Sequence, residues 1–143
     1  MKILVINGPN LNLLGSRENH IYGSLTLDNI NELIVDKFKS SNQDVILDFY
    51  QSNYEGDIVS KIQQAIGIYD GIVINPGAYS HYSIAILDAI RASNIITVEV
   101  HISNIYKRED YRRKSVISEG CYGVISGFGY YGYIMAIDAI INL

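Results

Sequence analysis

Residues 2–23 read KILVINGPNLNLLGSRENHIYG, and this stretch decides the fold of the chain. Its first part, residues 3–6, is an unbroken apolar run rich in β-branched side chains, which is typical of a strand buried on both faces of a sheet. At Asn7 the run gives way to Asn, Gly and Pro, which favour a turn. A loop then leads to a helix that we expect to begin at about Leu25. A buried strand, a loop and a helix form the first unit of an α/β fold.

The loop after this first strand is longer than most strand-to-helix connections, and such loops often carry function. It holds Asn10, Asn12, Arg17 and Tyr22. A tyrosine phenol has an ordinary pKa of about 10, and a fixed guanidinium nearby favours the phenolate. Arg17 and Tyr22 are therefore a candidate general base over a pocket at the end of the strand. A surface arginine and a tyrosine that packs the loop are the alternative.

The remaining elements alternate along the chain. Apolar runs predict further strands over residues 44–50, 71–74, 95–100 and 121–126, and helical periodicity predicts helices over residues 25–38, 53–69, 80–92 and 131–143. We expect Ser24 or Thr26 to cap the first helix and Ser80 to cap the third. The pattern predicts one α/β domain over residues 1–143, a flavodoxin-like doubly wound parallel sheet of order 2-1-3-4-5 with helices on both faces.

In such a sheet, ligands bind outside the carboxyl ends of the strands where the order reverses. The loops over residues 7–22, 75–81 and 101–112 should therefore meet at one crevice.

Composition limits the classes of function. With 143 residues, 48% hydrophobic and 18% charged, the chain is long enough for a globular core. It has no apolar run of membrane-spanning length and no signal-peptide pattern, so we expect a cytoplasmic protein with no membrane partner. Cys121 is its only cysteine, which excludes an internal disulfide. A net charge of −4 argues against a nucleic-acid partner.

Residues 75–81, NPGAYSH, follow the third expected strand. His81 is predicted near a helix N-terminus, where free N–H groups favour anions, so Asn75 and His81 are candidate ligand contacts. A capping segment with a solvated histidine is the alternative. Asp88 lies seven residues later, about 10 Å farther along a helix axis. If Asp88 contacts substrate, it therefore serves the site of a neighbouring subunit; otherwise it is an exposed helix aspartate.

Glu99 and His101 end the fourth expected strand. Alternate residues of a strand face the same side, so Glu99 can orient the imidazole and make His101 a general acid. A structural Glu–His hydrogen bond is the alternative.

Arg108 and Arg112 follow at helical spacing, which places both on one face. Two guanidinium groups suit a carboxylate, although a solvated basic face or a subunit contact would also use them. The three histidines lack the spacing of a metal site, and residues 7–10 are not a phosphate-binding loop.

Together these motifs closely resemble the type II 3-dehydroquinate dehydratases. The resemblance covers the chain from the first strand to the last helix. It rests on INGPNLNLLG at residues 6–15, Arg17 with YG at 22–23, NPGA at 75–78 with His81, DAI at 88–90, and EVHISN at 99–104 with Arg108 and Arg112.

The resemblance implies an anti elimination of water from 3-dehydroquinate to 3-dehydroshikimate through an enolate, in the shikimate pathway, with no metal or organic cofactor. It implies that Tyr22 is the base and that Arg17 keeps it ionised. Asn10 would hold the water that stabilises the enolate, and His101, oriented by Glu99, would protonate the departing hydroxyl. The positions that match substrate contacts are Asn75, His81, Asp88, Ile102, Ser103, Arg108 and Arg112.

The resemblance also implies a homododecamer of four trimers in which Asp88 reaches an adjacent site. Two other functions stay open on the residues alone. One is a non-catalytic flavodoxin-like module that binds a small anion or FMN, although the phosphate loop that FMN favours is missing after the first strand. The other is a lyase or isomerase acting on a different cyclic hydroxy-ketoacid.

Overall fold

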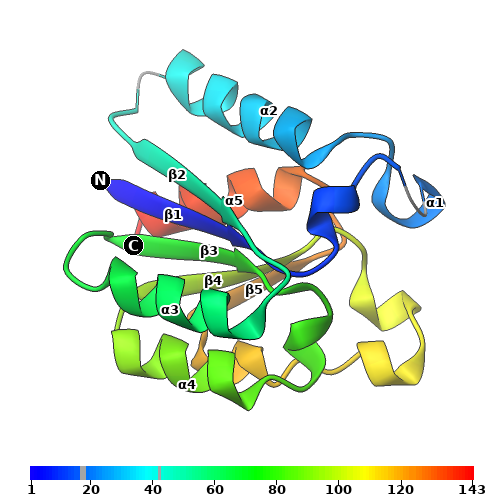
Figure 1. The fold of residues 1–143 in the computed structure, drawn as a ribbon. Coiled ribbons are helices and arrows are strands. Elements are labelled where there is room, and N and C mark those ends of the chain that lie inside the picture. The colour runs from blue at the N-terminus through cyan, green and yellow to red at the C-terminus, as the bar shows by residue number, and fades with distance from the viewer. Residues whose placement is uncertain (17–18, 42) are drawn as a thin grey trace.

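The computed structural model describes residues 1–16, 19–41 and 43–143, with the backbone alone at Asn19 and Tyr22. Its centre is a parallel sheet in which β2, β1, β3, β4 and β5 follow one another in space (Figure 1). The bounds are β1 (Lys2–Asn7), β2 (Ile46–Gln51), β3 (Gly71–Asn75), β4 (Ile96–His101) and β5 (Gly123–Ser126). The flavodoxin-like order 2-1-3-4-5 is confirmed, and it reverses direction at β1 and β3.

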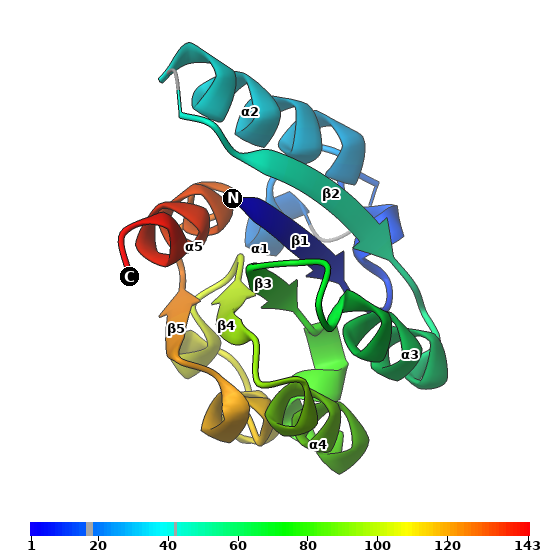
Figure 2. The same ribbon diagram turned by 90° about the vertical axis from the view of Figure 1, so that its left-hand side faces the viewer.

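Helices cover both faces of the sheet. The bounds are α1 (Asn19–Tyr22), α2 (Leu27–Ser40), α3 (Glu55–Ala65), α4 (Ile84–Ser93) and α5 (Tyr131–Ile141). The pair α2 and α5 lies on one face and the pair α3 and α4 on the other, as two views at right angles show (Figures 1 and 2). No helix in the described ranges is long and apolar enough to cross a bilayer.

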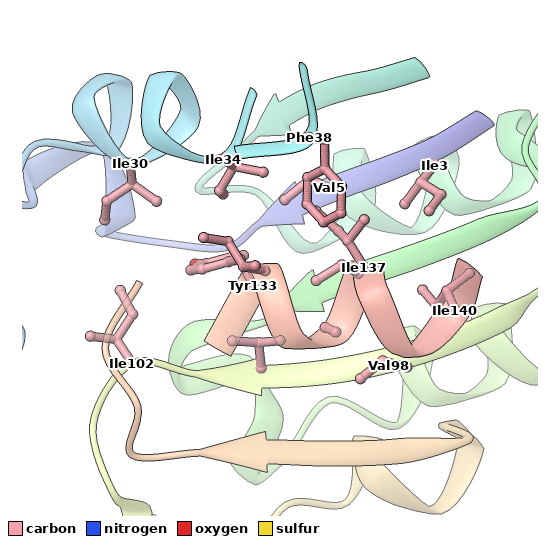
Figure 3. Close-up of a cluster of buried hydrophobic side chains, with 14 of the residues drawn as sticks. Ile3, Val5, Ile30, Ile34, Phe38, Val98, Ile102, Tyr133, Ile137 and Ile140 are labelled. Carbon is pink, nitrogen blue, oxygen red and sulfur yellow. The ribbon is translucent and has the colours of Figure 1, made fainter. Parts of the chain in front are cut away.

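The alternating side chains of β1 divide the core into two layers. Ile3 and Val5 pack with α2 and α5 (Figure 3), whereas Leu4 and Ile6 pack with α3 and α4. All four side chains are fully buried. The unbroken apolar run of β1 is therefore explained by a strand with a helix layer on each side.

Helix caps show where the sequence-based prediction holds and where it fails. Thr26 caps α2, because its hydroxyl accepts from the Asn29 N–H at 3.1 Å, as expected. Ser80 does not cap the third long helix, which begins at Ile84 and not at Ser80; Ser83 caps it by accepting from the Ile86 N–H.

Ser80 lies instead in a 3₁₀ turn, Gly77–His81, where its hydroxyl donates to the Gly77 carbonyl at 2.8 Å. The turn begins at Gly77, whose φ of +58° is a left-handed conformation that glycine adopts without steric cost.

The direction of the strands separates the two ends of the sheet. The loops after β1, β3 and β4 lie at the carboxyl edge. Both chain termini lie at the opposite edge, since β1 starts there and α5 runs back to it from β5 (Figures 1 and 2). The N-terminal amine donates there to the Asp44 carbonyl at 3.2 Å.

Gly8 permits the close approach of the first two loops at the carboxyl edge. Its N–H donates to the Asn75 carbonyl at 2.8 Å, and a Cβ at Gly8 would lie 2.4 Å from the Pro76 carbonyl oxygen. Gly8→Ala is therefore expected to lower the free energy of unfolding by about 1–3 kcal/mol, because backbone atoms must shift. Urea denaturation measures the change.

Gly56→Ala is the matched control for Gly8→Ala. Gly56 lies inside α3, and a Cβ there meets no atom within 4 Å. This change should stabilise the protein by up to about 1 kcal/mol through helix propensity. If the two variants shifted stability equally, the contact between Gly8 and Pro76 would not be the cause.

Candidate active site

A cavity of about 160 Å³ opens at the carboxyl ends of β1, β3 and β4. Three loops supply its walls, which is where the strand order places a ligand site. Its lining residues are Pro9, Asn10, Leu11, Leu14, Asn75, Gly77, Ala78, His81, His101, Ile102, Ser103, Ile105, Arg108 and Arg112. Eight residues that the sequence singled out therefore meet here, although they come from segments far apart in the chain.

The other predicted site residues lie elsewhere. Glu99 is fully buried behind His101. Asp88 is exposed on α4 and is not among the described residues that line the cavity. The prediction that Asp88 and His81 share one helix is wrong, because His81 belongs to the preceding 3₁₀ turn. Arg17 and the side chain of Tyr22 fall outside the described residues.

His101 is held from behind by a buried carboxylate. Its Nε2 lies 2.5 Å from Glu99 Oε1, and a carboxylate oxygen accepts, so Nε2 carries the hydrogen. This leaves Nδ1 as the ring nitrogen that is available to the cavity. The Ser115 hydroxyl donates to the same Glu99 oxygen at 2.7 Å. Two donors thus fix the carboxylate, and the carboxylate fixes the imidazole.

The charge of the same carboxylate also acts on Cys121. Burial, together with the charge of Glu99, raises the pKa of the Cys121 thiol to about 12. The thiol is therefore protonated at neutral pH and is a poor nucleophile. The chemistry of the site belongs to the imidazole and not to the single cysteine.

The polar side chains at the end of β3 and in the turn after it are fixed by hydrogen bonds. Asn75 Oδ1 accepts from the Gly77 N–H at 3.2 Å, and Asn75 Nδ2 donates to the Tyr133 hydroxyl at 2.8 Å. His81 Nδ1 lies 2.8 Å from the Lys114 carbonyl. Because a carbonyl accepts, Nδ1 carries a hydrogen, and Nε2 of His81 remains for a ligand.

Arg108 and Arg112 bring positive charge to the cavity. They do not share one helix, as the spacing predicted, because two 3₁₀ turns, Ile105–Lys107 and Asp110–Arg112, replace it. Both Nε atoms instead approach the Glu109 carboxylate, at 3.7 Å from Arg108 and 3.2 Å from Arg112. Arg108 also donates to the Ser103 hydroxyl at 3.2 Å.

The cavity is suited to an anion. Its described lining includes two arginines and no acidic residue. A guanidinium group binds a carboxylate through two parallel hydrogen bonds, and it gains most where water is partly excluded. Across the described ranges, no group of three His, Cys, Asp or Glu side chains is arranged to hold a metal ion.

Hydrogen bonds between two loops position Asn10. It adopts a left-handed conformation with φ 67°, and its N–H donates to Asn53 Oδ1 at 3.0 Å. The Gln51 amide donates both to the Gly8 carbonyl and to Asn53 Oδ1, at 3.1 Å each. The loop after β1 is therefore anchored to the loop after β2, which holds Asn10 at the cavity wall.

The segment around Tyr22 borders the same region. A second hollow of about 600 Å³ is lined by His20, Ile21 and Gly23, and also by three residues of the first cavity. Those three residues are Ile102, Ser103 and Arg108. The residues on either side of Tyr22 thus lie next to the cavity. Residues 19–22 form a short helix (α1) within the segment that the sequence predicts to be a loop.

Two further residues act on the site and were not predicted. Ser115 donates to Glu99, and Tyr133 contacts Asn75. Neither has a clear signal in the sequence. Ser115 follows a basic segment that predicted surface contacts. Tyr133 lies in the first turn of an apolar helix, where a tyrosine is expected to be ordinary core.

The chain is similar over almost its whole length to known proteins. The model of the family described as dehydroquinase class II matches residues 1–141. A 3-dehydroquinate dehydratase of Clostridium botulinum strain Hall is 66% identical over 140 residues, 98% of this chain and 94% of the relative. One of Clostridium acetobutylicum is 57% identical over 143 residues, 100% of this chain and 98% of the relative.

Solved structures agree with this similarity. The crystal structure of the type II dehydroquinase from Butyrivibrio crossotus matches with a TM-score of 0.94 and 53% identity, over 99% of this chain and 97% of the other. That of the type II dehydroquinase from Propionibacterium acnes matches with a TM-score of 0.91 and 40% identity, over the same shares.

Proposed function

Because the chain belongs to the class II dehydroquinase family, we propose that its cavity removes water from 3-dehydroquinate by an anti elimination through an enolate. The chain is a 3-dehydroquinate dehydratase, a hydro-lyase of the shikimate pathway. The alternative of a non-catalytic anion or FMN module is not supported. One observation carries the proposal for the site: eight predicted residues line a single cavity, and one of them, His101, is hydrogen-bonded to the buried Glu99 behind it.

The first half of the reaction needs a base. A proton on the carbon beside a ketone is acidic because its electrons move onto the ketone oxygen. We assign its removal to the Tyr22 phenolate, with the Arg17 guanidinium favouring the ionised form. The hollow lined by His20, Ile21 and Gly23 supports this assignment, since it shares three lining residues with the cavity.

The enolate that forms needs a hydrogen-bond donor at its oxygen. Asn10 is assigned to hold a water molecule that supplies this donor. Support comes from its place on the cavity wall and from the hydrogen bond of its N–H to Asn53, which fixes the backbone there. A donor that is already in place does not have to reorient when charge develops, so it lowers the barrier.

The second half of the reaction needs an acid. The departing hydroxyl accepts a proton and leaves as water while the enolate electrons form the new double bond. His101 is assigned as the acid, through the ring nitrogen that Glu99 does not use. The Glu99 carboxylate orients the ring, and it stabilises the imidazolium that supplies the proton.

The substrate carboxylate and hydroxyls need their own contacts. The main-chain N–H groups of Ile102 and Ser103 are assigned to the carboxylate. Arg108 and Arg112 add positive charge, while Asn75, His81 and Arg112 are assigned to the polar groups of the ring. The lining of the cavity, which joins these residues to two arginines, supports this division. Holding the ring at several points orients the reacting carbon toward the base.

The assembly is proposed as a cytoplasmic homododecamer of four trimers. Asp88 is assigned to the site of an adjacent subunit, which agrees with its exposure on α4 away from the cavity of its own chain. Light scattering measures the mass of the assembly in solution. A monomer that is fully active would contradict both the dodecamer and the role of Asp88.

The reaction itself has a direct test. The product is a conjugated enone, so mixing the purified protein with 3-dehydroquinate should give a rise in ultraviolet absorbance. The rate should be proportional to enzyme concentration and should survive exhaustive treatment with a metal chelator. An unchanged absorbance at every enzyme concentration would overturn the proposed mechanism and the site with it.

A further inference from the structure

We infer that Tyr133 is a positioning residue for the dehydration: its hydroxyl determines which way the Asn75 side-chain amide faces, so that Asn75 presents an N–H donor to the substrate. The inference rests on the proposed function of the cavity. It assigns a role in the reaction to Tyr133, which does not itself line the cavity, and it specifies which end of the Asn75 amide faces the substrate.

Tyr133 is an unusual member of the core. Its side chain is 0% exposed and packs among apolar residues between the sheet and α2 (Figure 3). A buried hydroxyl costs free energy unless it is hydrogen-bonded, and a phenylalanine would fill much the same space without this cost. The hydroxyl has two partners, Asn7 and Asn75, which face each other in the register of β1 and β3.

These hydrogen bonds form a chain with one direction. The Asn75 amide nitrogen donates to the Tyr133 oxygen at 2.8 Å, and the Tyr133 hydroxyl donates to Asn7 Oδ1 at 2.7 Å. Burial raises the pKa of the Tyr133 phenol, so it keeps its hydrogen across the physiological range. The Tyr133 hydroxyl donates its hydrogen to Asn7, so toward Asn75 its oxygen can only accept a hydrogen bond.

The other end of the Asn75 amide is also restricted. Its Oδ1 accepts from the Gly77 N–H at 3.2 Å. A flipped amide would place its NH₂ group against the Gly77 N–H and its oxygen against the Tyr133 oxygen, and it would lose both hydrogen bonds. An amide NH₂ group has two hydrogens, and Tyr133 takes one of them. The second hydrogen is the one that Asn75 offers to the cavity.

The experiment is a double-mutant cycle on the full-length enzyme. Tyr133→Phe should lower kcat/KM for 3-dehydroquinate about tenfold, mostly by raising KM, because a binding donor loses its fixed orientation. In an Asn75→Ala background, the same change should alter kcat/KM by less than about twofold, since there is no amide left to orient. Tyr131→Phe removes a hydroxyl from an exposed position of the same helix and should leave both constants unchanged.

A merely structural role gives a different result. Loss of stability alone would lower kcat/KM by the same factor in both backgrounds, and that additivity would overturn the inference. So would a Tyr133→Phe enzyme with unchanged KM. If the wild-type protein did not dehydrate 3-dehydroquinate, the proposed function would fail first, which separates the two failures.

A second variant covers the case in which Tyr133→Phe does not fold. Asn7→Leu removes the oxygen that accepts the Tyr133 hydroxyl hydrogen. The Tyr133 hydroxyl can then donate to the Asn75 side-chain oxygen instead, and it no longer fixes the orientation of the Asn75 amide. Its KM should rise in the presence of Asn75 and not in the Asn75→Ala background. An equal rise in KM with Asn75 and with Asn75→Ala would contradict the proposed direction of these hydrogen bonds.

Discussion

Replacing Tyr22 by phenylalanine is expected to lower kcat by about 10²- to 10⁴-fold, the range that general acid–base catalysis contributes. Phenylalanine keeps the aromatic ring and removes the hydroxyl oxygen that we assign to take the proton. KM should change much less, because the ring still occupies its place and the cationic lining of the cavity still binds the carboxylate. Steady-state formation of the enone at saturating substrate measures the loss.

Tyr54→Phe is the matched control for Tyr22→Phe. Tyr54 is 72% exposed at the start of α3, away from the residues that line the cavity. Its loss of a hydroxyl should leave kcat within experimental error of the wild type. A Tyr22→Phe enzyme with full activity would show that another group removes the proton, while the reaction itself would stand.

His101→Ala should lower kcat by a similar factor of about 10²- to 10⁴-fold, because the departing hydroxyl would lose the proton donor that we assign to it. The change also leaves Glu99 buried with Ser115 as its remaining partner, so some loss of stability is expected. Activity and thermal unfolding are therefore measured on the same preparation.

Chemical rescue separates the loss of an acid from the loss of structure. Imidazole added to His101→Ala can occupy the space left by the side chain, and it should restore part of kcat in proportion to its concentration. It should restore nothing in Tyr22→Phe, which keeps its histidine. An inactive His101→Ala enzyme that stays folded and is not rescued would contradict the assignment of His101 as the acid.

The sequence predicts the parts of the site that follow from strand order. The apolar run of β1 and the alternation of Glu99 and His101 depend on local spacing, and local spacing can be read from the chain. Once the order 2-1-3-4-5 is deduced, the loops that carry Asn10, Asn75 and His101 must meet at one edge. The convergence is therefore a consequence of topology.

The parts that the sequence did not predict depend on tertiary contacts. Ser80 and Ser83 are both good caps, and the turn at Gly77 decides between them. Arg108 and Arg112 have helical spacing, yet two 3₁₀ turns carry them to the cavity. Tyr133 is distinguished by its complete burial and by the hydrogen bonds of its hydroxyl to Asn7 and Asn75, and both depend on the folded structure.

The placement of both termini at the amino edge of the sheet has a practical consequence. A fusion partner or surface tether attached at Met1 or Leu143 begins at the edge of the sheet opposite the cavity (Figures 1 and 2). Immobilising the enzyme through either end should therefore keep the attachment point away from the cavity of the same chain. The same arrangement favours joining the two ends with a short linker and opening the chain at an exposed loop.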